Sequence, residues 1–245
     1  MQLFCFPYAG AGGWVYRRWR AEMPGIDARA VELPGRGTRA REAALTHLPS
    51  LAREVAEAIE PFAGRPFAFF GHSMGALIAF EVTRYLRREC GIEPVHLFVS
   101  GREAPHVASP DPSYHALPND ELVQVLRDLK GTPAEVLENA ELMQMLLPPL
   151  RADFALLESY RYSADTPLRC PITACGGTRD ATVRTDRLEA WRDLTTGPFL
   201  LRLIEGDHFF LHAPGSPLLR EIALVLAPPR GRNTCPAMTL PGQGG

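Results

Sequence analysis

The residue with the clearest chemical potential is Ser73, which stands at the centre of the sequence GHSMG at 71–75. An apolar, strand-like run at 66–70 precedes it, and a helix-like run at 74–89 follows. Gly-x-Ser-x-Gly between a strand and a helix predicts a nucleophile elbow, a tight turn that strains the serine backbone and exposes its hydroxyl. The N–H groups that begin the helix can stabilise an oxyanion. The motif therefore predicts a serine nucleophile; the alternative is a chance glycine-rich turn.

A serine hydroxyl is a weak nucleophile at neutral pH, so it needs a base, and the base needs a carboxylate that orients it. Strands expected at 171–175 and 199–204 are each followed by such a group, Asp180 after the first and His208 after the second. Open α/β sheets place their sites at the carboxyl ends of their strands. The order serine, acid, histidine also fits a sheet that carries a nucleophile elbow. We therefore predict that Ser73, Asp180 and His208 form a catalytic triad.

Other residues could take the roles proposed for Asp180 and His208. Asp180 could be a turn residue or cap the next helix, and Asp207 could supply the carboxylate, although it adjoins the histidine too closely to face its ring. Among the seven histidines, His212 is the one serious rival of His208, and we expect it to start the final helix instead. His72 is expected to point away from the reacting groups.

An acyl-transfer site also needs two N–H donors that stabilise the oxyanion. One is expected from Met74, directly after the nucleophile, and the other from the loop that follows the first strand. In that loop, at 7–13, we favour Ala9, with Tyr8 next. The loop could alternatively hold a phosphate. However, no lysine follows it as the Walker pattern requires, and its Gly-x-Gly lacks the third glycine of a dinucleotide fingerprint.

The elements that must position these groups are short apolar strands alternating with helices. Such alternation predicts a mostly parallel sheet with helices on both faces, and the nucleophile elbow makes this an α/β-hydrolase fold. Strands are expected at 2–6, 28–33, 67–70, 95–100, 171–175 and 199–204, and helices at 14–22, 47–62, 74–89, 186–194 and 218–226.

The alternation stops between about 115 and 162, where only helical segments are found. We predict a helical lid insertion over the site, because insertions of this size are commonly functional; a decorative bundle is the alternative. Asn119 or Asp120 is expected to cap its first helix, and the two prolines at 148–149 are expected to end a later one. The hydrolase domain should span 1–227, and the Pro/Gly-rich tail at 228–245 should be disordered.

Composition narrows the function classes. The hydrophobic fraction of 46% and charged fraction of 22% are ordinary for a globular protein, and the net charge of −2 implies no nucleic-acid partner. The five cysteines lack metal-binding spacing, so we predict no metal site and a reducing, cytoplasmic setting. No apolar run approaches the ~20 residues of a membrane span, and no signal peptide opens the chain, so no membrane association is expected. We expect a monomer.

Several motifs together resemble the type II, or editing, thioesterases that accompany polyketide synthases and non-ribosomal peptide synthetases. The resemblance covers nearly everything up to about residue 227 and rests on LFCFP at 3–7 with its following loop, ELPGRG at 32–37, GHSMG at 71–75, LPxxEL at 117–122, RADF at 151–154 and GDHFFL at 206–211. It implies release of acyl groups stalled on the phosphopantetheine arm of acyl or peptidyl carrier proteins, with no cofactor beyond that arm. By the same resemblance, the family's triad falls on Ser73, Asp180 and His208.

The chain departs from the family pattern in three places. Tyr8 stands where members commonly carry histidine or another residue, Ala181 stands where they often carry proline, and the short segment that usually precedes the first strand is missing. Five residues of the lid could line the acyl pocket or simply pack the lid: Leu126, Leu129, Met143, Met145 and Leu146.

Other readings of the same fold are a general carboxylesterase or lipase, a chain-releasing terminal thioesterase, and a catalytically inactive binding protein. Carrier proteins are acidic near their arm, so a basic rim would aid encounter. Two sets of arginines could supply that rim, although each residue could equally be a solvated surface group: Arg17, Arg18 and Arg20, or Arg36, Arg39 and Arg41.

Overall fold

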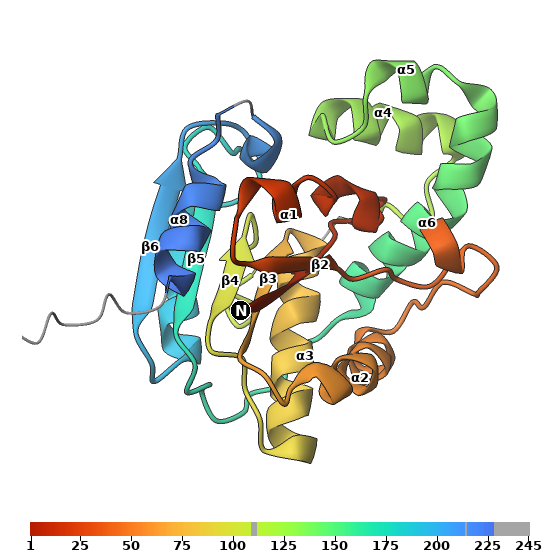
Figure 1. Ribbon diagram of the computed structural model, residues 1–245. Helices are drawn as coiled ribbons and strands as arrows, with labels where there is room; N and C mark the ends of the chain where they lie inside the picture. The colour runs from red at the N-terminus through yellow and green to blue at the C-terminus, as the bar shows by residue number, and fades with distance from the viewer. Residues whose placement is uncertain (109–111, 214, 228–245) are drawn as a thin grey trace, which may run out of the picture.

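Six parallel strands form the centre of the molecule (Figure 1). The computed structural model describes residues 1–108, 112–213 and 215–227. The sheet has the order β2-β1-β3-β4-β5-β6, and every pairing between neighbours is parallel, which confirms the predicted fold class. The strands are β1 (Gln2–Phe6), β2 (Asp27–Ala30), β3 (Phe67–His72), β4 (Leu97–Ser100), β5 (Ile172–Gly177) and β6 (Phe199–Ile204).

Alternate side chains of the strands enter two separate hydrophobic cores, one on each face of the sheet. Phe4 and Phe69 point to one face, and their neighbours Leu3 and Phe70 point to the other. Because successive side chains of a strand face opposite sides, strands buried on both faces must be apolar throughout, as β1 and β3 are.

Helices cover both of these cores. The first face is covered by α2 (Leu48–Ile59), α3 (Met74–Cys90), α7 (Thr185–Glu189) and the 3-10 helix η4 (Ala190–Leu194), whose buried side chains belong to one core. The second face is covered by α1 (Trp19–Glu22) and α8 (Leu218–Leu226) with the 3-10 helices η1 (Gly13–Tyr16) and η5 (Phe210–His212). Two further short 3-10 helices are η2 (Gly37–Arg39) and η3 (Glu60–Phe62).

Among the described residues between β4 and β5, three helices lie in the region expected to be a lid: α4 (Asn119–Leu129), α5 (Ala134–Leu137) and α6 (Ala140–Ser159). Figure 1 shows α4 and α5 standing apart from the sheet at the upper right, with α6 leading back towards it. Only Leu122, Leu126 and Leu137 are buried in α4 and α5. This pair of helices therefore contributes little to the main core.

Several expected boundaries are wrong. The helix expected at 14–22 is split into η1 and α1, the strand at 28–33 ends at Ala30, and Pro118 rather than Asn119 or Asp120 occupies the N-cap position of α4. The prolines at 148–149 lie inside α6 and do not end it. Proline removes a backbone donor, but Leu147 and Leu150 on either side are buried, so packing holds the helix continuous. The tail predicted to be disordered lies outside the described residues.

The topology fixes where a site can form. The sheet grows from β1 to β2 in one direction and from β3 to β6 in the other, so the strand order reverses between β1 and β3. Ligands of open α/β sheets bind beyond the carboxyl ends of the strands at such a switch point. The loop after β1 and the turn after β3, the two segments expected to hold the oxyanion donors, both begin there. Within the described residues, no helix has the length and hydropathy needed to cross a membrane.

Candidate active site

Ser73 occupies the tight turn between β3 and α3. Its φ of 52° and ψ of −116° are strained for a residue with a side chain, as a nucleophile elbow requires. Glycines make the turn possible: a Cβ on Gly71 would lie 2.1 Å from the Gly75 carbonyl oxygen, and a Cβ on Gly75 would lie 2.1 Å from the Phe6 carbonyl oxygen. Both glycines of the motif are therefore required by backbone contacts.

His208 and Asp180 meet across the ends of β5 and β6. The Asp180 Oδ2 atom lies 2.7 Å from His208 Nδ1, and the Asp180 side chain is 1% exposed. Thr182 adds to this contact, because its backbone N–H and hydroxyl both donate to Asp180 Oδ1, at 2.8 and 2.7 Å. The bond at Nδ1 leaves the other ring nitrogen, Nε2, available for a nucleophile.

The electrostatics of this contact favour an ionised carboxylate. Burial by itself would raise the pKa of Asp180, but the hydrogen bond and charge of His208, with the two hydrogen bonds from Thr182, lower that pKa below its usual value. An ionised Asp180 is the form that can orient an imidazole and stabilise the imidazolium that develops during proton transfer.

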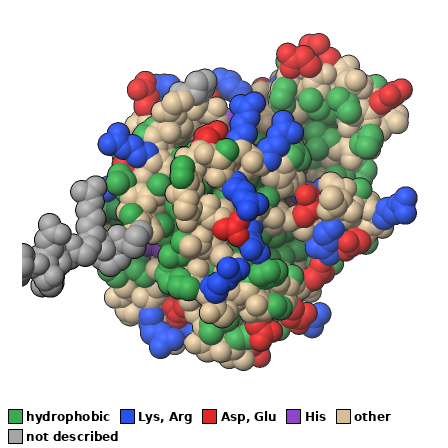
Figure 2. All heavy atoms as spheres, in the orientation of Figure 1, with side chains coloured by type: hydrophobic (Ala, Val, Ile, Leu, Met, Phe, Trp, Pro, Cys, Tyr) green, Lys and Arg blue, Asp and Glu red, His purple; other side chains and the backbone are tan. Residues whose placement is uncertain are grey.

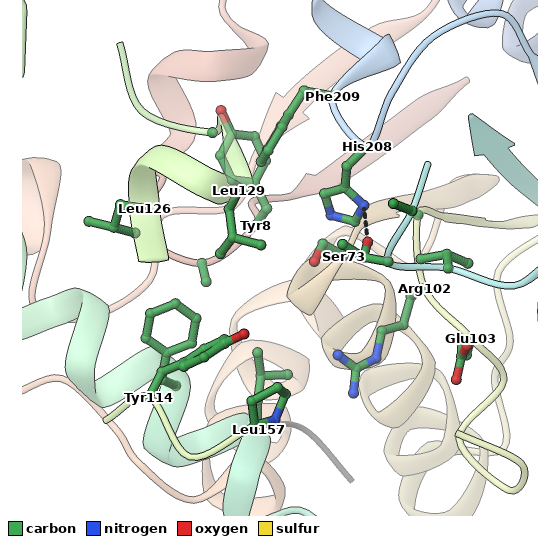
Figure 3. A pocket seen from close by; sticks show the side chains of 18 of the residues that line it. Tyr8, Ser73, Arg102, Glu103, Tyr114, Leu126, Leu129, Leu157, His208 and Phe209 are labelled. Atoms are coloured by element: carbon green, nitrogen blue, oxygen red, sulfur yellow. Dashed lines mark hydrogen bonds between the residues drawn. The ribbon is translucent and has the colours of Figure 1, made fainter. Parts of the chain in front are cut away.

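Ser73 and His208 line one pocket of about 530 Å³, and Figure 3 shows them at the same end of it. The predicted competitors have other partners. The Asp207 side chain accepts the Phe209 N–H. His212 ends η5 and does not start the final helix as expected; its Nε2 lies 3.0 Å from the Tyr8 hydroxyl.

The two expected oxyanion donors stand in the loop after β1 and directly after Ser73. Met74 is the first residue of α3, where helix N–H groups have no partner within the helix. Ala9 lines the pocket. In the same loop, the Gly10 N–H donates to Asp153 and the Ala11 N–H donates to the Tyr8 carbonyl. These two neighbours are thus committed to structural bonds, which favours Ala9 as the donor that faces the pocket.

The apolar part of the pocket comes largely from the lid. Leu126 and Leu129 of α4 line it as expected, together with Tyr114 and Leu157 (Figure 3). Leu150 and Phe154 of α6 line it as well. The other three expected lining residues are not among those that line it: Met143 is buried in the core, Met145 is 75% exposed, and Leu146 packs against the core. Helical spacing placed them correctly on α6 but could not tell which face of α6 meets the pocket.

The lid touches the catalytic region as well. A Cβ on Gly131, just after α4, would lie 2.4 Å from the Phe209 ring, next to His208 in sequence. Because residue 131 has no side chain, the chain just after α4 can pack against the histidine loop, the loop that carries His208 and Phe209. This contact closes one side of the pocket.

The two sets of arginines differ in their surroundings. Arg17, Arg18 and Arg20 are exposed, in a region where Figure 2 shows basic side chains over α1 and β2. In the second set, Arg41 is exposed, whereas Arg39 pairs with Glu42 and Glu54. The Arg36 side chain is 9% exposed and pairs with Asp153, so its assignment to a surface rim is wrong.

Sequence reasoning missed three contributors to the site. His72, expected to point away, packs its ring 4.9 Å from the ring of His208. Thr182 has no motif that marks it, although it stands two residues after the predicted acid. The contact between Arg36 and Asp153 joins two segments, ELPGRG and RADF, that the sequence singled out without connecting them.

Known proteins resemble this chain over most of its length. A family model described as the thioesterase domain matches residues 1–223. LgrE of Brevibacillus parabrevis, named linear gramicidin dehydrogenase, is 48% identical over 91% of this chain and 87% of its own.

Two solved structures are similar over almost the whole chain. RedJ, the thioesterase of the prodiginine pathway in Streptomyces coelicolor, is 40% identical with a TM-score of 0.87 and covers 92% of this chain and 90% of its own. BorB, the type II thioesterase of the borrelidin cluster, is 38% identical with a TM-score of 0.84 and covers 91% of each chain. With a family model that spans both the elbow and the histidine loop, this chain belongs to the thioesterase domain family.

Proposed function

We propose that this protein hydrolyses acyl thioesters on the phosphopantetheine arm of acyl or peptidyl carrier proteins, and so clears stalled acyl groups from polyketide or non-ribosomal peptide assembly. The observation that carries the proposal is the Asp180–His208 contact at 2.7 Å beside a pocket that also holds the strained Ser73. Membership of the thioesterase family and similarity to type II enzymes support the thioester as the bond that is cleaved.

The reaction proceeds in two steps. In the first, the Ser73 hydroxyl attacks the thioester carbonyl while His208 takes its proton, and the N–H groups of Ala9 and Met74 stabilise the oxyanion. The carbon–sulfur bond then breaks, and the arm leaves as a thiol with a proton supplied by His208. In the second step, His208 activates a water that cleaves the acyl-serine ester, which releases the carboxylic acid and regenerates the hydroxyl. Asp180 orients the imidazole throughout.

The pocket suits such a substrate. Its apolar wall of Leu126, Leu129 and Phe154 can accept an acyl chain, while Arg184 and Arg187 lie among the other lining residues. An apolar cavity with a few polar groups is typical of a small-molecule site. The phosphopantetheine belongs to the substrate, so we propose that the enzyme needs no cofactor and no metal of its own.

A carrier protein is the proposed partner. The exposed Arg17, Arg18 and Arg20 offer positive charge to an acidic surface, whereas Glu135 and Glu138 make the tip of the lid acidic (Figure 2). Complementary charge speeds encounter and suppresses wrong orientations. We therefore propose that the carrier protein approaches over α1 and away from α5. A monomer in the cytoplasm remains our prediction for its state and location.

The name of one relative, linear gramicidin dehydrogenase, suggests a redox reaction instead. The glycine-rich loop of this chain gives that reading little support. It lacks the third glycine of the dinucleotide fingerprint and leads into η1, a 3-10 helix of four residues, where a dinucleotide site has a longer helix whose N-terminus holds the pyrophosphate.

Hydrolysis of acyl groups from a purified acyl carrier protein tests the proposal, with p-nitrophenyl esters of the same acyl groups as the comparison. We expect kcat/KM to be higher for the carrier-bound thioester, and we expect Ser73→Ala to abolish both activities and labelling by a fluorophosphonate. Equal or faster turnover of the simple esters would favour a general carboxylesterase. Full activity in Ser73→Ala would remove the proposed mechanism.

A further inference from the structure

A buried ion pair holds the loop that carries the proposed oxyanion donor Ala9. Arg36 and Asp153 face each other in a bidentate arrangement, with Nη1 2.7 Å from Oδ2 and Nη2 2.6 Å from Oδ1. The side chains are 9% and 3% exposed. Such a fork-to-fork contact fixes both partners in direction as well as in distance.

Both members of the pair also bind the backbone of the loop after β1. The Gly10 N–H donates to Asp153 Oδ2 at 2.8 Å, and Arg36 Nη1 donates to the Ala11 carbonyl oxygen at 3.1 Å. The loop thus has a charged contact on the two residues that directly follow Ala9. Its far end is held as well, since the Gly13 N–H donates to the Glu32 carboxylate at 3.3 Å.

The loop after β1 packs closely enough on α6 for this contact to set the path of the loop backbone. Gly10 has a φ of +76°, a conformation that favours glycine, and a Cβ at this position would lie 2.9 Å from Leu150 Cδ1. Leu150 and Asp153 lie on the same helix, α6, whose side chains also form part of the pocket wall. The loop is therefore seated directly on α6.

Stability alone does not account for this pair. Taking two charges out of water is costly, and replacing a buried ion pair by well-packed apolar side chains is often neutral or stabilising. A buried pair does fix the orientation of the groups that it binds. Here these groups are the Gly10 N–H and the Ala11 carbonyl oxygen. The pair also balances charge, because an unpaired carboxylate near the oxyanion would oppose the negative charge that develops in the transition state.

We propose that Arg36 and Asp153 are positioning residues for the oxyanion hole: they hold the loop after β1 so that the Ala9 N–H faces the developing negative charge, and they keep the Asp153 charge neutralised. The inference rests on the proposed function, because it assigns a role to Ala9 in that reaction. It predicts that the pair affects the rate of the chemical step and leaves substrate binding nearly unchanged.

Two double variants separate positioning from stability. Arg36→Met with Asp153→Asn removes both charges but keeps a carbonyl oxygen that can accept the Gly10 N–H. Arg36→Met with Asp153→Leu removes both charges and this acceptor. We expect the variant with asparagine to retain most of the wild-type kcat and the variant with leucine to lose about 10- to 100-fold, because a displaced donor costs rate in this range. KM should change little in either.

The single variant Arg36→Met tests the charge. It leaves Asp153 with the Gly10 N–H but without its counter-ion, so kcat should fall below that of the double variant with asparagine. Adding Asp153→Asn to Arg36→Met should therefore restore rate. Arg84→Met serves as the matched control, since Arg84 forms a similarly buried pair with Glu81 but does not line the pocket. Its thermal stability should change while kcat stays at the wild-type value.

The readouts are kcat and KM for a carrier-bound thioester, the second-order rate at which a fluorophosphonate labels Ser73, and the thermal unfolding midpoint. Labelling needs the oxyanion hole but not the acyl pocket, so it should fall in parallel with kcat. If the leucine double variant is folded and retains wild-type kcat and labelling, the inference is wrong. If instead the wild-type protein does not hydrolyse the carrier-bound thioester, the proposed function itself is wrong, which is a distinct result.

Discussion

The ring of His72 packs against the ring of His208, with centroids 4.9 Å apart and planes tilted by 53°. His72 is fully buried, and its Nδ1 lies 3.0 Å from the Ser100 hydroxyl. Burial, with the nearby His208 and His212, holds the pKa of His72 well below its usual value, so this ring is neutral. The catalytic imidazole proposed above thus rests on a second, uncharged imidazole that the elbow itself provides.

Removing this support should slow the reaction. We expect His72→Ala to lower kcat by about 10-fold, because a cavity beneath His208 lets the ring leave its position against Asp180. His72→Gln keeps much of the volume and a group that can bond to Ser100, so it should retain more of the rate. Steady-state kinetics on a carrier-bound thioester checks both variants. Wild-type kcat in a folded His72→Ala protein would show that the contact is only packing.

The contact between Asp180 and His208 gives a second prediction. Asp180→Asn should lower kcat by about 10²- to 10⁴-fold, because an amide neither holds the imidazole in the right tautomer nor stabilises its charged form. Thr182→Val removes one of the two bonds from Thr182 to Asp180 but leaves the carboxylate, so a smaller loss is expected. Fluorophosphonate labelling of Ser73 reports on both. Equal losses in the two variants would mean that Thr182, rather than the carboxylate charge, controls the base.

The lid should set which acyl groups are accepted. Leu129→Phe narrows the pocket, so kcat/KM for long acyl chains should fall by about 10-fold while that for acetyl changes little. Met145→Phe is the matched control on the same lid, since Met145 is 75% exposed and outside the pocket. A panel of acyl-carrier substrates of increasing chain length measures this. A uniform loss across the panel would place Leu129 outside the acyl site.

Stability should depend on pH through His96, a residue away from the pocket. Its burial lowers its pKa from 6.5 to about 4. Between pH 6.5 and about pH 4, His96 is therefore neutral in the folded protein, whereas in the unfolded chain it takes up a proton. The contribution of His96 to stability is complete above about pH 6.5 and is lost as the pH falls towards 4, at up to about 1.4 kcal/mol per pH unit.

His96→Gln keeps a partner for the Thr173 hydroxyl, which lies 2.8 Å from the histidine Nε2, and removes the titration. The free energy of unfolding, measured with denaturant between pH 7 and 4, should then fall less steeply than in the wild type, with kcat unchanged at neutral pH. Identical slopes for the two proteins would contradict the assignment.

The sequence predicts the sheet and the reacting groups better than it predicts the contacts among loops. Strand-then-helix alternation and the GHSMG turn depend on local patterns, so β6, α8 and the elbow appear as expected. Asp180 and His208 follow strands whose ends must share one edge of a parallel sheet, so topology alone brings them close.

Features that depend on packing were not predictable in the same way. Two adjacent prolines indicate a helix end, yet α6 continues because its buried side chains outweigh the two missing backbone donors. An arginine in a glycine-rich loop looks exposed, yet Arg36 finds a buried carboxylate far along the chain. No periodicity or motif encodes such a pairing, because it is decided by how the lid helix lies on the sheet.

The modest burial of α4 and α5 has a consequence for how such enzymes diversify. These helices supply Leu126 and Leu129 to the pocket but place few side chains in the main core. Substitutions there can reshape the acyl cavity at small cost to folding, whereas changes in β3 or its turn disturb the strained serine. Sequence changes in α4 and α5 can therefore adapt the same reacting residues to the different stalled acyl groups of other biosynthetic systems.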